Sequence, residues 1–369
     1  MGAGVGAAAT RMTGGRGPDE GQRRLPVATV ARPGETGPQT DAGTGTGEAS
    51  GAPLERPERP ERPVRLGGSE VEVSPLGTGT WAWGDRLTWG YGRDYDEGDC
   101  RGAFAASLGA GLTLFDTAEL YGWGESERLL GRFIRERGLR PETAVVATKF
   151  FPYPWRLRHG DAVAALRGSL SRLGLPRVDL YQLHWPLPVF SVARRMDALA
   201  ETVQAGLTRA VGVSNYTAAD LRRAHAALAR RGIPLASNQV HYSLLHRSPE
   251  RDGVLAACRE LNVTLMAYSP LEQGLLTGKY GPGRPPPARR RRRAGPHPET
   301  LVPLVAALRA AGEAHGGKTP AQVALNWLLC RGALPIPGAK RPDQARDNAG
   351  ALGWRLTPEE VETLDRLSR

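Results

Sequence analysis

Long apolar runs are missing from this sequence of 369 residues. No stretch approaches the roughly 20 hydrophobic residues that a membrane-spanning helix needs, so we expect a soluble protein without a membrane partner. Hydrophobic residues nevertheless make up 40% of the chain. That content is sufficient for one large core or two ordinary ones.

Cysteine is scarce, and the chain contains only Cys100, Cys258 and Cys330. Their spacing matches neither a metal site nor a redox motif. A sparse, odd set of cysteines is typical of reduced thiols in an intracellular compartment. We therefore expect all three to be packing residues, and we expect no bound metal.

Acidic residues are outnumbered, because 49 Lys and Arg face 38 Asp and Glu, which gives a formal net charge of +11. Such a surplus occurs in nucleic-acid-binding proteins. Here, however, five positive charges stand in one run, Arg289–Arg293, and few aromatic residues lie among the basic ones. No zinc-finger or RNA-binding motif is present. A site for anionic small molecules explains the charge as well, and we expect no nucleic-acid partner.

Residues 1–62 lack lysine and are rich in Gly, Pro, Thr and Arg. Such a segment cannot bury enough apolar surface to offset its ordering entropy, so we predict a disordered N-terminal extension before a single domain at 63–369. The first 18 residues contain Arg11 and Arg16 but no acid, as organelle transit peptides do. Serine is scarce, however, and acids occur from Asp19 on. A transit peptide, with a location in the plastid stroma or the mitochondrion, and a plain extension of a cytoplasmic protein both remain open.

From Arg65 onward, short apolar runs alternate with amphipathic stretches, such as the one that carries Leu129, Leu130, Phe133 and Ile134 on one helical face. The expected strands lie within 71–81, 112–116, 144–150, 178–186, 208–216, 234–240, 263–270 and 333–339. The expected helices lie at 96–108, 126–138, 161–174, 191–206, 217–232, 253–262, 319–332 and 341–351. Strict alternation implies parallel strands with right-handed crossovers. Eight such units in roughly 300 residues predict a (β/α)₈ TIM barrel in the α/β class.

Polar side chains stand where successive strands end. The second, third and fourth strands end at Asp116, Lys149 and His184, and Tyr121 follows shortly after Asp116. Because chemistry in such a barrel sits at the C-terminal ends of the strands, we expect these four groups to meet. Lys149 then pairs with Asp116 and lowers the pKa of the Tyr121 phenol, which becomes a general acid. His184 supplies a second donor for a carbonyl oxygen.

The sequence offers no catalytic nucleophile, since it has no G-x-S-x-G elbow, no Cys–His pair and no metal-ligand cluster. A hydride from a nicotinamide cofactor fits, because the cofactor then carries the difficult chemistry. Ser214, Asn215 and Gln239 suit a carboxamide, and Tyr268 suits a flat ring. Near the end of the chain, the segment IPGAKRPDQARDN places two cations, at 340–341, beside a helix N-terminus, which favours the additional phosphate of NADP. A solvated loop is the alternative for these two cations.

The motifs FDTAELYG, ATKF, LHWP, GVSNY, NQVHYSLL and IPGAK–DQARDN occur in this order at the strand ends, and together they resemble the aldo-keto reductase superfamily from about Arg65 to the end. The resemblance implies a tetrad of Asp116, Tyr121, Lys149 and His184, with Tyr121 as proton donor, and NADP(H) as cofactor. The implied NADP contacts are Thr80, Trp81, Ser214, Asn215, Gln239, Tyr268, Ser269, Pro270, Leu271, Gly338, Ala339, Lys340, Gln344 and Asn348.

Within that superfamily, GTWAWGD–LTWGYG, YPWRLR and GALGWRLT resemble the plastid and cyanobacterial branch that includes chloroplast pyridoxal reductase. This implies reduction of an aldehyde or ketone, with pyridoxal as a candidate substrate. We expect Trp81 and His184 in the substrate site. Trp89, Trp155 and Arg156 add an aromatic, basic wall for a pyridine aldehyde, or Trp155 and Arg156 merely pack their own loop.

A regulatory role is the alternative to catalysis. The resemblance extends to potassium-channel beta subunits, which share the fold, bind NADP and act largely through a partner, with little turnover. A complete tetrad favours an enzyme, and nothing in the sequence indicates a docking surface or an oligomeric state. The run Arg289–Arg293 either clamps phosphates of the cofactor or lies in a solvated loop.

Overall fold

The computed structural model describes residues 62–368, except 141, 157, 188–189, 282 and 286–300. The predicted extension, apart from residue 62, and the run Arg289–Arg293 therefore lie outside the described residues. Within the described part, no helix has both the length and the apolar character to cross a membrane.

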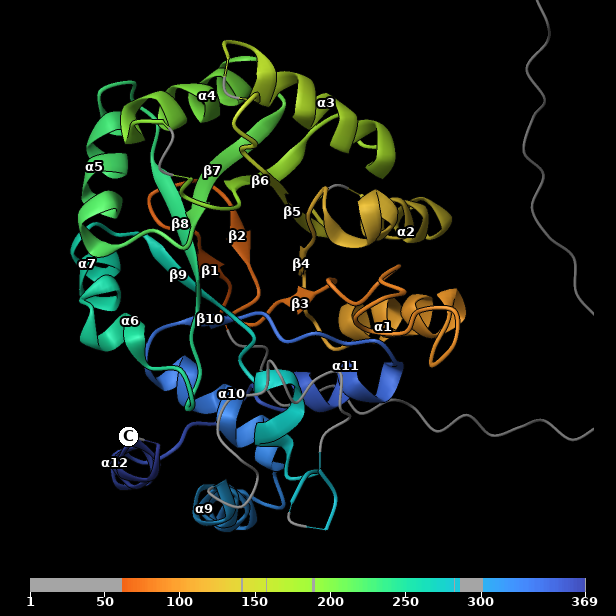
Figure 1. Cartoon of the computed structure of the whole chain (residues 1–369). Helices are drawn as coiled ribbons and strands as arrows, with labels where there is room; N and C mark the ends of the chain where they lie inside the picture. The colour runs from red at the N-terminus through yellow and green to blue at the C-terminus, as the bar shows by residue number, and fades with distance from the viewer. Residues whose placement is uncertain are drawn as a thin grey trace, which may run out of the picture. The chain divides into compact units, whose positions relative to one another are not determined.

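A ring of eight parallel strands forms the centre of the domain (Figure 1). In sheet order the strands are β3 (Thr78–Gly79), β4 (Leu114–Asp116), β5 (Val145–Phe150), β6 (Val178–Leu183), β7 (Thr208–Ser214), β8 (Leu235–His241), β9 (Thr264–Tyr268) and β10 (Leu334–Pro335). The amides of Gly77 and Gly79 donate hydrogen bonds to the carbonyl oxygens of Pro335 and Pro337 and so close the ring between β10 and β3. The predicted (β/α)₈ barrel is confirmed.

Helices surround the strands (Figure 1). They are α1 (Glu97–Gly109), η1 (Tyr121–Gly124), α2 (Glu125–Glu136), α3 (Asp161–Leu173), α4 (Val192–Gln204), α5 (Ala218–Ala229), α6 (Ser248–Arg251), α7 (Val254–Glu260), η2 (Glu272–Thr277), α9 (Val302–Ala314), α10 (Pro320–Cys330), α11 (Pro342–Ala349) and α12 (Pro358–Leu367). Predicted helix ends are confirmed where the sequence carried caps, because Thr217 caps α5 and Gly174 ends α3 in the left-handed conformation. Helices α9 and α12 were not predicted.

The first predicted strand is wrong in detail. Within residues 71–81 the structure has two strands: β2 (Glu72–Val73) pairs antiparallel with β1 (Val64–Arg65), and only β3 joins the barrel. The turn of this hairpin lies near the N-terminal ends of the strands, where the Gly67 amide donates to Thr264 Oγ1 at 2.8 Å. The hairpin therefore sits at the end of the barrel opposite the predicted site.

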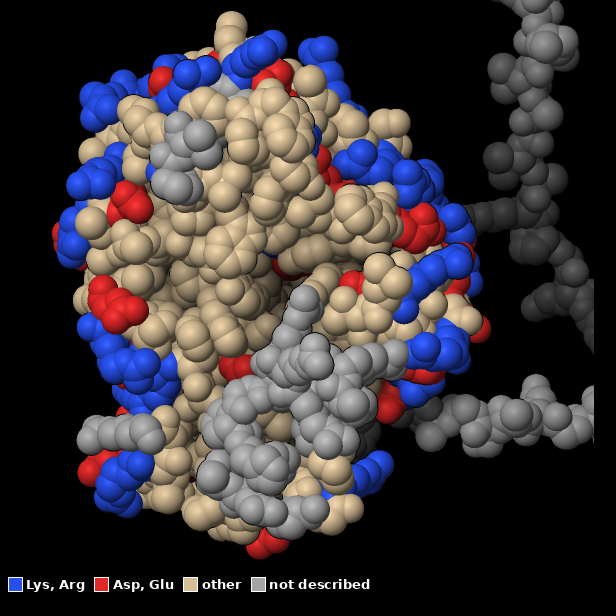
Figure 2. All heavy atoms as spheres, in the orientation of Figure 1, with Lys and Arg blue, Asp and Glu red and all other residues tan. Residues whose placement is uncertain are grey.

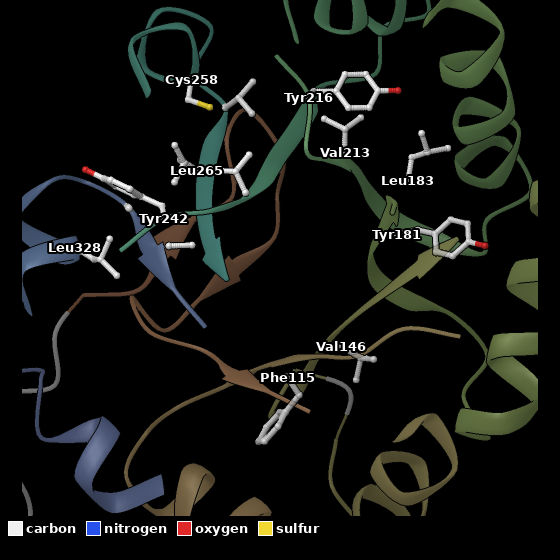
Figure 3. Close-up of a cluster of buried hydrophobic side chains, with 14 of the residues drawn as sticks. Phe115, Val146, Tyr181, Leu183, Val213, Tyr216, Tyr242, Cys258, Leu265 and Leu328 are labelled. Atoms are coloured by element: carbon white, nitrogen blue, oxygen red, sulfur yellow. The ribbon is translucent and has the colours of Figure 1, made fainter. Parts of the chain in front are cut away.

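Alternation along the strands sorts side chains between two core layers. Phe115 and Val146 pack in the outer layer toward the helices (Figure 3), whereas Leu114 and Val145 pack with the residues that fill the barrel. The same alternation continues to the ends of β4 and β5. It turns Asp116, two residues after Leu114, toward the inside of the barrel.

Candidate active site

Asp116 and Lys149 form a buried ion pair at the ends of the adjacent strands β4 and β5. Lys149 Nζ donates to Asp116 Oδ2 at 2.5 Å and to the carbonyl oxygen of Thr117 at 2.8 Å. Both residues are nearly inaccessible, with exposed fractions of 0% for Lys149 and 2% for Asp116. The cation expected for Asp116 from the sequence is therefore in place.

The Tyr121 hydroxyl completes this group. It lies 3.3 Å from Lys149 Nζ, and the ammonium group also lies 4.9 Å from the centre of the phenol ring. Tyr121 is held by η1, where Gly122 and Trp123 both adopt positive φ. The tight, left-handed turn directly after Tyr121 leads the chain into α2.

The His184 ring stands edge-on to Tyr121, with 5.8 Å between the ring centres. Its Nδ1 is buried and has no hydrogen-bond partner among the described residues. Burial foremost, and then the charge of Lys149, lowers the pKa of His184 to about 3. The imidazole is therefore neutral at physiological pH, and the structure brings all four predicted tetrad residues together.

One electrostatic prediction is wrong. We expected Lys149 to lower the pKa of Tyr121, but burial foremost, followed by the charge of Asp116, raises it well above 10. Burial also lowers the pKa of Lys149, against the opposing effect of Asp116. A phenol with a raised pKa stays protonated at neutral pH, so Tyr121 carries a proton that it can donate.

A cavity of about 500 Å³ opens beside Tyr121 and His184. Figure 2 shows the molecule hollowed near the centre of this view, among mostly uncharged residues, with Lys and Arg toward the perimeter. Most of the predicted cofactor contacts line the cavity: Trp81, Ser214, Asn215, Gln239, Tyr268, Ser269, Pro270, Leu271, Gly338, Lys340, Gln344 and Asn348.

Thr80 and Ala339 are the two predicted contacts that do not line the cavity. The Thr80 hydroxyl donates to the Asp116 carbonyl oxygen at 2.9 Å, and the Ala339 carbonyl oxygen accepts from Trp83 Nε1 at 2.8 Å. Both are buried behind the wall. Their side chains support the site from behind, so any direct contact with a cofactor is limited to the backbone.

Amide groups form the inner end of the cavity. Gln239 Nε2 donates to Asp116 Oδ1 at 2.8 Å, and Asn215 Nδ2 donates to the His184 carbonyl oxygen at 3.3 Å. The Tyr268 hydroxyl donates to Asn215 Oδ1 at 3.0 Å. The amides are thus tied to the tetrad itself, and Tyr268 presents a flat ring next to them.

Two residues behind Tyr268 were missed from the sequence. The His241 ring stacks on Tyr268, with 5.3 Å between centres and 15° between planes, and His241 Nε2 lies 2.6 Å from the Glu272 carboxylate. Glu272 is buried and has a positive φ. His241 ends β8, so the strand-end argument used for the tetrad could have found it.

The outer end of the cavity carries positive charge. Lys279 and Lys340 line it, and Arg341 stands at the start of α11, whose first amides have no side-chain cap. Helix N-termini and cations bind phosphate. With amides and a flat ring at one end and cations with a helix N-terminus at the other, the residues fit a nicotinamide dinucleotide.

Comparison with known proteins shows the family of the chain. A sequence model described as "Aldo/keto reductase family" matches residues 75–369. The chain is 44% identical over 312 residues to "Pyridoxal reductase, chloroplastic" of Arabidopsis thaliana, which covers 82% of this chain and 84% of that protein. It is 35% identical over 278 residues to "Aldo-keto reductase yakc [NADP(+)]" of Schizosaccharomyces pombe, which covers 70% and 79%.

Among solved structures, a thermostable aldo-keto reductase, Tm1743, superposes with a TM-score of 0.68 at 33% identity, covering 83% of this chain and 99% of that one. The chain belongs to the aldo/keto reductase family. The resemblance seen in the sequence is confirmed, and this reductase is an oxidoreductase of the kind that uses NAD(P)H.

The substrate end of the reductase differs from the sequence prediction. Trp81 and His184 line the cavity, but Trp155 and Arg156 do not. Arg156 forms a bidentate ion pair with Glu119, at 2.9 and 3.0 Å. Trp155 stacks on Tyr153, and 69% of its surface is exposed. The predicted basic wall is therefore wrong for Trp155 and Arg156, and the alternative holds, because both residues make their contacts with Tyr153 and Glu119 outside the cavity lining.

Proposed function

We propose that this protein reduces an aldehyde or a ketone with NADPH and that Tyr121 donates the proton. The observation that carries the proposal is the position of the Tyr121 hydroxyl. It lies 3.3 Å from the buried ammonium group of Lys149, beside a neutral His184, on the wall of a cavity that fits a dinucleotide.

In this proposal each side chain has one task. The bound cofactor supplies the hydride. Tyr121 and His184 hold the carbonyl oxygen as negative charge develops on it, which is the role of donors fixed in advance at a reacting oxygen. Tyr121 passes its proton to that oxygen, and the Lys149 ammonium stabilises the phenolate that remains. Asp116 fixes Lys149 through the ion pair at their shared end of the barrel.

We further propose NADP rather than NAD as the cofactor. Lys340 lines the cavity near the start of α11, whereas Arg341 does not line it and pairs with Asp99 at 3.4 Å; NADP differs from NAD by one phosphate. The named relative of Schizosaccharomyces pombe carries NADP(+) in its name, which supports the same choice. Lys340→Met is expected to weaken the binding of NADPH more than the binding of NADH.

Pyridoxal is the substrate that we propose to test first, because a relative with 44% identity is named pyridoxal reductase. The substrate end of the cavity offers Trp81, Trp89 and Trp185, which suit a flat, uncharged aldehyde. The same relative is named chloroplastic. With the composition of residues 1–62, that name supports our proposal of a plastid location.

The test is NADPH oxidation followed at 340 nm with pyridoxal, benzaldehyde and a panel of other aldehydes and ketones. We expect turnover, faster with NADPH than with NADH. Pyridoxal turnover no better than that of benzaldehyde rejects pyridoxal and leaves the reductase. Tight NADPH binding without turnover of any carbonyl rejects the enzyme and favours the regulatory alternative.

A further inference from the structure

One carboxylate joins the segments that follow β4 and β5. Glu119 stands two residues before Tyr121, and its side chain is only 10% exposed. Its Oε1 accepts a hydrogen bond from the Phe151 amide at 2.7 Å, and its two oxygens accept from Arg156 at 2.9 and 3.0 Å. These bonds tie the segment that carries Tyr121 to the segment that follows Lys149.

Phe151 extends this connection to His184. It directly follows the last residue of β5, and its ring stands edge-on to the His184 ring, with 6.0 Å between the ring centres. The Tyr121 ring also stands edge-on to His184, at 5.8 Å. His184 Nδ1 has no hydrogen-bond partner in the part of the chain that the structure describes. Packing against Phe151 and Tyr121 therefore contributes to the direction of the imidazole.

The loop after β5 is held around the same carboxylate. Tyr153 lies against Phe151, with 4.6 Å between ring centres, and the Arg156 guanidinium lies 4.9 Å from the centre of the Phe150 ring. A bidentate pair between arginine and a carboxylate fixes direction as well as distance. The pair with Glu119 therefore fixes this loop relative to the segment that leads into η1.

We propose that Glu119 is a positioning residue that sets the placement of the Tyr121 hydroxyl relative to His184. It does not line the cavity, and it acts on the imidazole through Phe151 and on the phenol through the two intervening bonds of the chain. Arg156 holds Glu119 in this task. The inference rests on the proposed function, because two donors must converge on one carbonyl oxygen, and a displacement of about 1 Å can lower a rate about 10²-fold.

The first test measures kcat for aldehyde reduction and the dissociation constant for NADPH on the full chain. Glu119→Ala removes the bonds to both Phe151 and Arg156, and kcat is expected to fall about ten- to a hundredfold. The dissociation constant for NADPH is expected to stay unchanged, because Glu119 lies outside the cavity lining. Glu119→Gln keeps an acceptor for the Phe151 amide and is expected to recover most of the lost rate.

Asp179 offers a matched control near the N-terminal ends of the strands, away from the site. Its Oδ1 accepts from Arg209 at 2.9 Å, and its Oδ2 accepts from the Val146 amide at 2.9 Å. Its side chain is 12% exposed, so it repeats the arrangement of a carboxylate between a guanidinium group and a backbone amide. Asp179→Ala is expected to lose stability in urea denaturation much as Glu119→Ala does, but to keep the wild-type kcat.

Three results of these measurements would overturn the proposal. An equal loss of kcat in Glu119→Ala and Asp179→Ala would mean that both carboxylates only stabilise the fold. A wild-type kcat in Glu119→Ala would mean that the placement of the two donors does not depend on this carboxylate. A Glu119→Gln variant as slow as Glu119→Ala would mean that the bond to the Phe151 amide is not the route.

The second test observes the Phe151 amide directly, by hydrogen exchange measured with NMR. A hydrogen-bonded amide exchanges only when its bond opens. Glu119→Ala is expected to speed exchange of this amide about ten- to a hundredfold, the worth of a hydrogen bond to a charged group, whereas Asp179→Ala is expected to leave it unchanged. Unchanged exchange in Glu119→Ala would show that the carboxylate does not hold this loop, and would overturn the proposal.

Failure of this inference and failure of the proposed function give different results. If Glu119→Ala reduces aldehydes at the wild-type rate while Tyr121→Phe does not, only the inference fails. If the wild-type protein reduces no carbonyl compound, the proposed function fails, and the inference fails with it.

Discussion

At the scale of single residues, the ion pair of Asp116 and Lys149 places two charges in the buried interior of the site. Taking two charges out of water is unfavourable, and removing one partner leaves the other buried without compensation. We expect Asp116→Asn and Lys149→Met each to lower the free energy of unfolding by about 3–5 kcal/mol. Urea denaturation measures both values.

The double variant is the control for this prediction. It removes both charges, so its loss of stability is expected to be clearly smaller than the sum of the two single losses. Strictly additive losses would mean that the two groups do not stabilise each other, whatever their distance.

His184 gives a prediction for how the free energy of unfolding depends on pH. Its pKa is about 3 in the folded protein and about 6.5 in an unfolded chain. Below pH 6.5 the unfolded state therefore binds more protons, and stability falls as the pH is lowered toward 3. Between pH 7 and pH 5 this residue alone is expected to remove about 2 kcal/mol.

His184→Phe lacks the titrating imidazole. The comparison is therefore between the pH dependence of the unfolding free energy in the wild type and in the variant. Unfolding free energies of the wild type and the variant, each measured at pH 7 and pH 5, isolate the contribution of the imidazole. Equal losses in both proteins would contradict a lowered pKa of His184 in the folded protein.

The tetrad could be predicted from the sequence because strand ends of a parallel barrel meet on one side, so Asp116, Lys149 and His184 needed only the strand pattern. The pKa of Tyr121 could not. Its direction depends on how far the fold buries the phenol, which no spacing of residues reveals. The prediction that Arg156 lines the substrate site was wrong for a similar reason, since its partner Glu119 lies 37 positions away in the sequence.

At the scale of elements, the contact between α2 and α3 requires one particular glycine. A methyl group on Gly131, in α2, would overlap the carbonyl oxygen of Leu173 at the end of α3. Gly→Ala within a helix ordinarily stabilises by up to about 1 kcal/mol. Gly131→Ala is expected instead to destabilise the protein by about 1–3 kcal/mol through overpacking, as measured by urea denaturation.

Gly168, within α3, is the matched control. A methyl group there meets only the end of the Arg172 side chain, at 3.5 Å. Gly168→Ala is therefore expected to leave stability unchanged or to raise it slightly. If both substitutions stabilise, the two helices are not packed as closely as described.

Local signals in the sequence led to the prediction of α5, but not every such signal was used. Helix α5 carries Thr217 as its cap and was found. Helix α12 begins with a capping box at Thr357 and Glu360, a signal that was overlooked. The strand β3 has only two residues, Thr78 and Gly79, and its place in the ring depends on bonds to a segment more than 250 positions later, which local patterns cannot supply.

At the scale of the whole molecule, the distribution of lysine follows the site. The sequence has four lysines, Lys149, Lys279, Lys318 and Lys340, among 49 basic residues. Lys149 belongs to the tetrad, and Lys279 and Lys340 line the cavity. A compact ammonium group differs from the planar fork of arginine, so a chain that otherwise uses arginine retains lysine mainly where the chemistry needs a point charge.

The measurement that tests the central claim most directly is the steady-state rate of aldehyde reduction by Tyr121→Phe, with NADPH affinity determined on the same preparation. The substitution removes one hydroxyl and keeps the ring. The account predicts that kcat falls about 10²–10⁴-fold, the usual contribution of a general acid, while the dissociation constant for NADPH is unchanged. A variant that reduces the same aldehyde at the wild-type rate would contradict it.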